Sequence, residues 1–300
     1  MVQHDPIRRR SRPAPDETTE QALRRLLGRY LSQVRQAEPA TAKGSVDGLH
    51  DLRVGLRKIR NVVLLFHDVD PSFLGKLDRR ISNVSDRMGE ARDLDVWAAI
   101  FRELDAAGGQ GRISRRDRQA VEKGLKKQRD RLTAAALADP VYREVKAMVW
   151  AYIRTVPSRK SKKSPRGLAA RQMLVVRDLI DARYRRVGGY SCNRAHQLRK
   201  AGRRMRYLAE FFAPDIGPVC VEATEVVTRV QSALGKVHDC DSALELSADL
   251  PTGKARTFVR EALSSRRADY LHKFKTAWRQ YADRRLQQAW QAQLEAASAS

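Results

Sequence analysis

Two stretches of the chain match each other at a fixed separation of 146 residues. The first, HDLRVGLRKIRN, begins at His50, and the second, HQLRKAGRRMRY, begins at His196. In both, arginine follows the histidine at the third, seventh and tenth positions. A second pair of blocks keeps the same separation, because MGEARDLD from Met88 aligns with LGKVHDCD from Leu234. Two separated matches that share one offset without a gap predict that the chain consists of two copies of one structural unit.

The repeated unit is predicted to be helical. Apolar residues recur at helical spacing along most of the chain, and alternating β-branched runs are few. The helical pattern breaks at residues 37–48, 68–72, 106–112, 138–140, 187–193, 213–218 and 250–253. We therefore predict an all-α fold, in which a long helix from about residue 73 to 104 is disturbed at Gly89.

Composition divides the chain into segments. The predicted segments are a disordered basic arm at residues 1–15, the first helical repeat at 16–154, a basic linker at 155–166, the second helical repeat at 167–290 and a frayed tail at 291–300. We expect residues 16–290 together to form one domain.

The spacing of the first match places its histidine and arginines on one face of a helix. At about 100° per residue, these four side chains lie within an arc of about 80°. Apolar residues lie on the other side, namely Leu52, Leu56, Ile59 and Val63, and in the second copy Leu198, Gly202, Met205 and Ala209. A solvated face normally mixes both signs of charge, whereas these stripes contain no acid. We therefore predict that each stripe faces something negative.

Arginine in this role indicates phosphate. Its planar fork grips phosphate oxygens with two parallel hydrogen bonds, each contributing about 1.5–3 kcal/mol. The formal net charge of +24 attracts polyanions in general, including nucleic acid, an anionic membrane surface or a phosphate polymer. We place His50 and His196 in the first helical turn, after caps at Asp47 and Asn193, where free amides favour an anion. A purely structural histidine is the alternative.

The second pair of blocks contributes two acids per copy, Asp93 and Asp95, then Asp239 and Asp241. These carboxylates are candidates for a metal or acid–base site. The alternative, which we favour, is that they hold arginines in place by salt bridges, because charged groups that face a ligand need partners that fix their rotamers. Further cations are expected to join the anion surface, namely Arg92, its equivalent His238, and Arg79 and Arg80 from the same helix as Arg92.

The paired HxLRxxxRxxR stretches, each followed by G-x-x-[HR]-D-x-D, resemble the CHAD family, the conserved histidine α-helical domain. The resemblance covers about residues 16–290. It implies two helical bundles related by a pseudo-two-fold axis around a basic cavity, binding of inorganic polyphosphate, and attachment to polyphosphate granules. It carries polyphosphate contacts over to His50, Arg53, Arg57, Lys58, Arg60, His196, Arg199, Arg203, Arg204 and Arg206. Lys58, opposite Arg204, is a departure that would bind less directionally.

We therefore expect non-catalytic binding of inorganic polyphosphate, with no metal or cofactor and with other granule proteins as further partners. A nucleic-acid-binding protein is the first alternative, but aromatic residues make up only 6% and no helix-turn-helix, finger or RNA-recognition signature is present. A metal-dependent polyphosphate-processing enzyme is the second. The sequence contains neither a GxxxxGK[ST] loop nor HExxH spacing.

The expected compartment is the cytoplasm, on polyphosphate granules. No run of about 18 apolar residues predicts a membrane span, and the first residues lack the apolar core of a secretory signal. Three cysteines without finger-like spacing, Cys192, Cys220 and Cys240, fit reduced thiols.

Overall fold

The computed structural model describes residues 17–108, 114–155, 164–185, 192–249 and 253–299. These ranges form ten α-helices, two 3-10 helices and no strand, which confirms the all-α prediction. The first five helices are α1 (Thr19–Ala42), α2 (Val46–Leu65), α3 (Pro71–Gly108), α4 (Arg115–Ala138) and α5 (Pro140–Arg154). The last five are α6 (Pro165–Arg185), α7 (Cys192–Ile216), α8 (Pro218–Leu246), α9 (Lys254–Tyr281) and α10 (Arg284–Ser298). Within the described ranges, no helix combines the length and apolarity that crossing a membrane requires.

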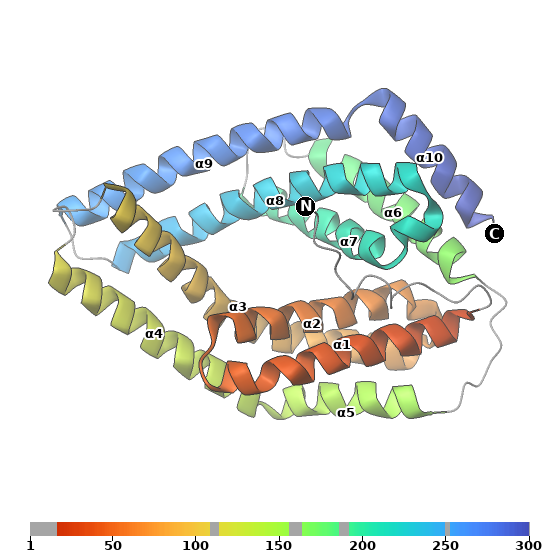
Figure 1. The fold of residues 1–300 in the computed structure, drawn as a ribbon, viewed down its shortest axis with the longest axis horizontal. Helices are drawn as coiled ribbons and strands as arrows, with labels where there is room; N and C mark the ends of the chain where they lie inside the picture. The colour runs from red at the N-terminus through yellow and green to blue at the C-terminus, as the bar shows by residue number, and fades with distance from the viewer. Residues whose placement is uncertain (1–16, 109–113, 156–163, 186–191, 250–252, 300) are drawn as a thin grey trace, which may run out of the picture.

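The helices of the second half repeat those of the first in the same order (Figure 1). Shifted by 146 residues, the starts of α1 and α2 coincide with those of α6 and α7. The same neighbours also touch in both halves: α1–α2, α2–α3, α3–α4, α1–α5 and α3–α5 recur as α6–α7, α7–α8, α8–α9, α6–α10 and α8–α10. The sequence repeat is therefore a repeat of five packed helices.

One apolar core joins the two halves. The apolar faces predicted for α2 and α7 are buried, with Leu52, Leu56 and Met205 at 0% exposure. Rings from the two halves meet inside this core, since Tyr30 of α1 lies 5.5 Å from Phe211 of α7, and Phe66 lies 6.5 Å from Phe212, centroid to centroid. This shared core brings the cationic sides of α2 and α7 near each other.

The turn between α1 and α2 is shorter than the predicted loop at residues 37–48, which was wrong in extent. α1 continues through Pro39 to Ala42. The proline removes one backbone hydrogen bond, but the burial of Thr41, which is 1% exposed, keeps the last turn helical. Gly44 then turns the chain at φ +79°. Ser45, not Asp47, caps α2, since its side chain accepts a hydrogen bond from the amide of Gly48 at 3.0 Å.

Three other predicted boundaries also differ from the structure. The tail expected to fray is the second half of α10, which buries Leu294 and Ala297 against the core. α3 runs through Gly89 without interruption, and the break at residues 213–218 is reduced to Gly217. The predicted arm at residues 1–15 and most of the linker at 155–166 lie outside the described ranges.

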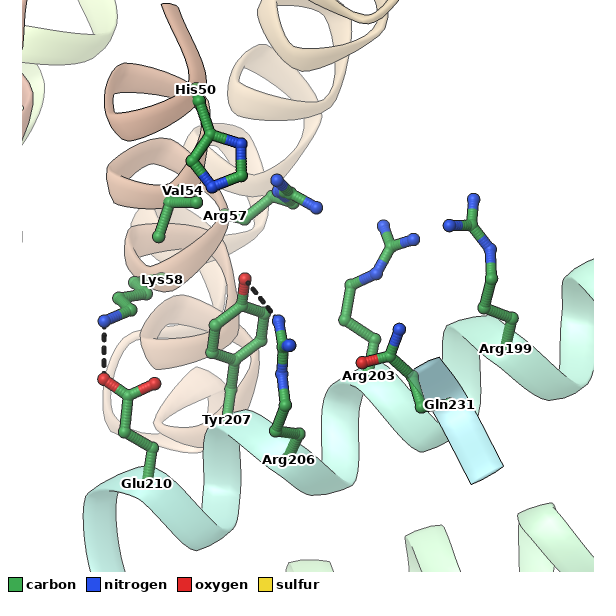
Figure 2. Close-up of a pocket in the computed structure, with 10 residues that line it drawn as sticks. All are labelled: His50, Val54, Arg57, Lys58, Arg199, Arg203, Arg206, Tyr207, Glu210 and Gln231. Atoms are coloured by element: carbon green, nitrogen blue, oxygen red, sulfur yellow. Dashed lines mark hydrogen bonds and ion pairs between the residues drawn. The ribbon is translucent and has the colours of Figure 1, made fainter. Parts of the chain in front are cut away.

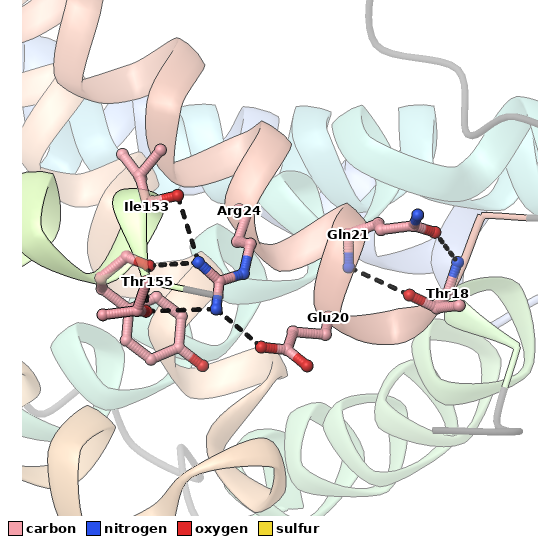
Figure 3. A network of polar contacts seen from close by, with 7 residues as sticks. Thr18, Glu20, Gln21, Arg24, Ile153 and Thr155 are labelled. Atoms are coloured by element: carbon pink, nitrogen blue, oxygen red, sulfur yellow. Dashed lines mark hydrogen bonds and ion pairs between the residues drawn. The ribbon is translucent and has the colours of Figure 1, made fainter. Parts of the chain in front are cut away.

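A polar network fixes the C-terminal end of α5 on α1 (Figure 3). The guanidinium of Arg24 donates to the carbonyls of Tyr152 and Ile153, the second at 3.1 Å, and pairs with Glu20 at 2.7 Å. It thus satisfies carbonyls that the last turn of a helix leaves unpaired. These contacts hold the last turn of α5, which ends at Arg154, against α1.

Candidate anion-binding pocket

A pocket of about 420 Å³ lies between α2 and α7. Figure 2 shows guanidiniums from both helices pointing toward one another across it. The lining residues are His50, Val54, Arg57 and Lys58 of α2, Arg199, Arg203, Arg206, Tyr207 and Glu210 of α7, and Gln231 of α8. Four arginines and one lysine therefore converge on a pocket that contains a single carboxylate among its described lining.

The two helices present different sides of the same stripe to this pocket. Arg57 and Arg203 are the one pair of repeat-equivalent residues among the lining residues that the structure describes. On α2 the lining extends toward Lys58, whereas on α7 it extends toward Arg199 and Arg206. At about 100° per residue, the two arcs differ by about 60°. The site is consequently asymmetric although its sequence repeats.

Arg53 lies beside the pocket, not in its lining. Its Nη2 atom is 3.6 Å from the position that a Cβ on Gly89 would occupy, so it packs against α3 where that helix has no side chain. Burial, and then the neighbouring charge of Arg57, lower the pKa of Arg53 to about 10. Arg92 is also close to this group, and its Nη1 lies 3.8 Å from Asp95. Together, Arg53 and Arg92 extend the cationic surface beyond the pocket.

Four predicted contact residues lie elsewhere. Arg60 pairs with Asp78 of α3 at 2.7 Å, and Arg204 donates to Gln172 of α6 at 2.7 Å. On the outer side of α3, Arg80 pairs with Glu144 of α5 at 2.9 Å, and Arg79 is exposed. The structure uses Arg60, Arg80 and Arg204 to attach one helix to another.

The histidines occupy different surroundings in the two halves. His50 lines the pocket, whereas the ring of His196 lies 5.2 Å from that of His238. Burial and then the charge of Arg199 lower the pKa of His196 to about 4, and the same two causes lower the pKa of His238. These rings are therefore neutral at pH 7.

The predicted contribution of helix N-termini to the site was wrong. With Ser45 as the cap, His50 is the fifth helical residue of α2. The amide of Leu49, one residue before it, already donates to the carbonyl of Ser45 at 3.1 Å. The free amides of the first turn therefore lie upstream of the histidine.

Uncompensated charge is concentrated at Arg203. Burial, followed by repulsion from Arg199 and Arg57, lowers the pKa of Arg203 to about 9. No carboxylate in the described part of the chain pairs with this guanidinium. A bound anion would supply the missing partner, because buried charges in proteins are normally paired.

Glu210 and Tyr207 are pocket residues that the sequence reasoning missed. Glu210 continues the α7 stripe one turn beyond Arg206, and its Oε1 lies 2.5 Å from Nζ of Lys58. The Tyr207 hydroxyl accepts a hydrogen bond from Arg206 at 3.4 Å, while the residue itself is 1% exposed. Extending the helical stripe by one more turn would have identified the acid.

The second acid of each block pairs with an arginine of the adjoining helix. Asp95 lies 3.4 Å from Arg129 of α4, and Asp241 lies 2.5 Å from Arg267 of α9. This arrangement agrees with the salt-bridge interpretation for these two residues. Burial raises the pKa of Asp239, the first acid of the second block. Among the described residues, no group of three or more potential ligands is arranged to hold a metal ion.

Comparisons with known proteins give one family and two related structures. The family model described as "CHAD domain" matches residues 25–248. The CHAD domain from the plant Ricinus communis is 23% identical with a TM-score of 0.63, covering 98% of this chain and 97% of that one. PptA from Streptomyces chartreusis is 16% identical with a TM-score of 0.66, covering 88% of this chain and 100% of that one. No curated protein gives a significant sequence match.

Proposed function

This chain belongs to the CHAD domain family, and from that premise we propose that it binds inorganic polyphosphate, without altering it, in the pocket between α2 and α7. The observation that carries the proposal is the convergence of Arg57, Arg199, Arg203 and Arg206 on one pocket. Their forks suit phosphate oxygens, and an anion among them would relieve the repulsion that disfavours charge at Arg203.

The shape of the cationic surface supports a linear ligand. Arg199, Arg203 and Arg206 lie along one side of α7, a row of about 10 Å at 1.5 Å per residue. Arg53 and Arg92 extend the positive charge beyond this row. An unbranched chain with charge in every unit uses such a row fully, so a polymer is favoured over a single phosphate.

Two alternatives receive less support. Single-stranded nucleic acid usually stacks its bases on aromatic rings, and the described lining contains no phenylalanine or tryptophan and one tyrosine, Tyr207, which is buried. A magnesium-dependent enzyme would need free carboxylates, and Asp95 and Asp241 already pair with arginines. We further propose, from the family, that the protein associates with polyphosphate granules in the cell.

A competition experiment with matched variants tests the proposal. Immobilised long-chain polyphosphate should retain the protein in preference to duplex DNA, ATP or short phosphates at equal phosphate concentration. Replacing Arg57 and Arg203 with glutamine should reduce retention at least about a hundredfold, given two charge-assisted contacts of about 1.5–3 kcal/mol each. Replacing Arg79 and Arg80, which removes the same charge outside the pocket, should leave retention nearly unchanged.

Three results would contradict the proposal. Displacement of bound polyphosphate by an equal concentration of DNA phosphate would favour the nucleic-acid alternative. Equal losses in the two double variants would show that net charge, not the pocket, governs binding. Release of phosphate from the polymer by the purified protein, lost on changing Asp93 to asparagine, would support an enzyme.

A further inference from the structure

A second basic surface lies on the outer side of the first half, where α5 packs on α1. Trp150 of α5 is 43% exposed, and among the described aromatic residues it alone is classed as exposed. The guanidinium carbon of Arg35 lies 4.6 Å from the centre of its ring, and that of Arg154 lies 5.5 Å from it. We call these three residues the Arg–Trp surface.

The two arginines of this surface are available to a partner. Both are exposed, and neither forms a hydrogen bond or ion pair with another residue in the described ranges. One turn earlier on α5, Lys146 has a similar position but already binds Glu38 of α1. A cation over an aromatic ring is attracted to it while keeping N–H groups free for a second partner. The Arg–Trp surface thus presents two guanidiniums whose charge no described carboxylate pairs with.

The repeated fold does not require this surface. At the equivalent position of α6, Asp181 stands where Arg35 does on α1. The buried residues Trp290, Leu294 and Ala297 of α10 repeat the spacing of Val145, Val149 and Tyr152 on α5, which places Glu295 where Trp150 stands. α6 and α10 nevertheless pack together as α1 and α5 do. An exposed tryptophan between two arginines has the composition of an interface hot spot, and structural need does not account for it.

We propose that the Arg–Trp surface docks an acidic peptide segment of a partner protein, which lies extended across the edge of Trp150 with carboxylates on Arg35 and Arg154. Both guanidinium carbons lie close to one ring, so they are at most about 10 Å apart. Acidic residues at alternate positions of an extended peptide, spaced about 6.6 Å along the backbone, can reach both. The net charge of +24 repels a second copy of this chain, which favours a different, acidic partner.

A peptide fits this surface better than a nucleic acid. A base would stack on the indole, but two guanidiniums already lie over that ring. A carboxylate approaches the guanidinium edges instead, in the plane where arginine binds two oxygens at once. The network around Arg24 holds the C-terminal end of α5, and so the backbone of Arg154, against α1 (Figure 3). This inference does not depend on polyphosphate binding.

Quenching of tryptophan fluorescence by acrylamide provides the test. The other tryptophans, Trp97, Trp278 and Trp290, are at most 7% exposed, so quenching reports mainly on Trp150. A short fluorescein-labelled peptide of alternating glutamate and serine should bind the full chain and, by covering the edge of Trp150, reduce this quenching. Replacing Arg35 and Arg154 with glutamine should weaken peptide binding about tenfold or more, the upper range for two exposed ion pairs.

A matched variant separates this surface from the pocket. Replacing Arg57 and Arg203 removes the same charge from the pocket and should leave peptide affinity within about twofold. Equal weakening by both double variants, or no weakening by the first, would overturn the proposal. The proposal would also be overturned if the peptide does not bind but a single-stranded oligonucleotide does. The oligonucleotide would then reduce acrylamide quenching of Trp150 in the parent protein and not in the Arg35 and Arg154 double variant.

Discussion

Replacing Arg203 with methionine should make the unliganded protein more stable while weakening polyphosphate binding. Methionine retains an apolar stem of similar length but removes a guanidinium that is buried beside other arginines. At pH 7 this arginine is protonated in both the folded and the unfolded chain. Because folding lowers its pKa to about 9, the folded state is the less favourable place for that proton. The charge therefore costs stability at every pH below about 9.

The size of the effect follows from the pKa. At about 1.4 kcal/mol per pH unit, the difference between about 9 and the ordinary value of arginine corresponds to roughly 4–5 kcal/mol as an upper bound. Water and counter-ions reduce this cost, and exchanging a buried charge for an apolar side chain commonly gains about 1–4 kcal/mol. We expect a gain of about 1–2 kcal/mol, a rise in Tm of roughly 3–5 °C for a chain of this size.

Thermal unfolding followed by circular dichroism, at low salt and with or without long-chain polyphosphate, checks both parts. Polyphosphate should raise the Tm of the parent protein. At a free ligand concentration about a hundred times Kd, the added stability is about 2.7 kcal/mol. The Tm of the variant should rise far less. The control is Arg60→Met, which removes the same charge from the α2 stripe. Arg60 is paired with Asp78, so this change should lower stability by up to about 1 kcal/mol.

A clear fall in the Tm of Arg203→Met would refute the reasoning, because it would show that the arginine has a stabilising partner in the unliganded protein. A higher Tm combined with undiminished polyphosphate binding would refute the assignment of the pocket. The two parts of the prediction are therefore separately testable.

Three other predictions concern the ion pair in the pocket, the buried histidine of α7 and two helical glycines. Changing Glu210 to glutamine should free Lys58 from its 2.5 Å ion pair and raise polyphosphate affinity by about threefold to fivefold. The slope of log affinity against log salt concentration should become steeper by up to about one, which filter binding at several salt concentrations would show. Between about pH 6.5 and pH 4 the unfolded chain takes up a proton that folded His196, with a pKa of about 4, does not. Because solvent screens this partly exposed ring, the fall in stability over this range, measured by urea unfolding, should be about 1–2 kcal/mol smaller in His196→Gln than in the parent. Gly48→Ala should lower the free energy of unfolding by about 1–3 kcal/mol, because the added carbon would lie 2.7 Å from the backbone nitrogen of Thr41. Gly124→Ala, which has open space around it in α4, should raise the free energy of unfolding by about 0.5–1 kcal/mol in the same urea assay.

The sequence predicts the buried faces better than the contacts of the charged ones. Leu56 and Met205 are buried as their helical spacing requires, because any partner helix must cover an apolar face. Which stripe residues meet in the pocket depends on how far each helix is rotated about its axis. That rotation is set by packing against neighbours far away in sequence. Arg60 and Arg206 hold equivalent positions in the repeat, yet Arg60 pairs with Asp78 whereas Arg206 lines the pocket.

The predictions for the chain end and the turn near Pro39 were wrong for a different reason. Proline and small residues near Pro39 resemble a loop, but the burial of Thr41 keeps that segment helical. The composition of the tail resembles disorder, although Trp290, Leu294 and Ala297 follow helical spacing and are all buried. In the tail, the helical spacing of a few buried apolar residues outweighs the local composition.

The rotation of the two helices also explains how a repeated sequence forms a pocket whose lining is not symmetric. Arg57 and Arg203 come from equivalent positions and together bring positive charge to the centre of the pocket. On one side of this pair the pocket ends at Lys58, which Glu210 partly neutralises; on the other, positive charge continues through Arg199 toward Arg53. A polyanion in the pocket would therefore meet a weaker potential at Glu210 than at Arg199. The Glu210→Gln variant should remove that difference, so its effect on affinity measures how far the pocket departs from the symmetry of its sequence.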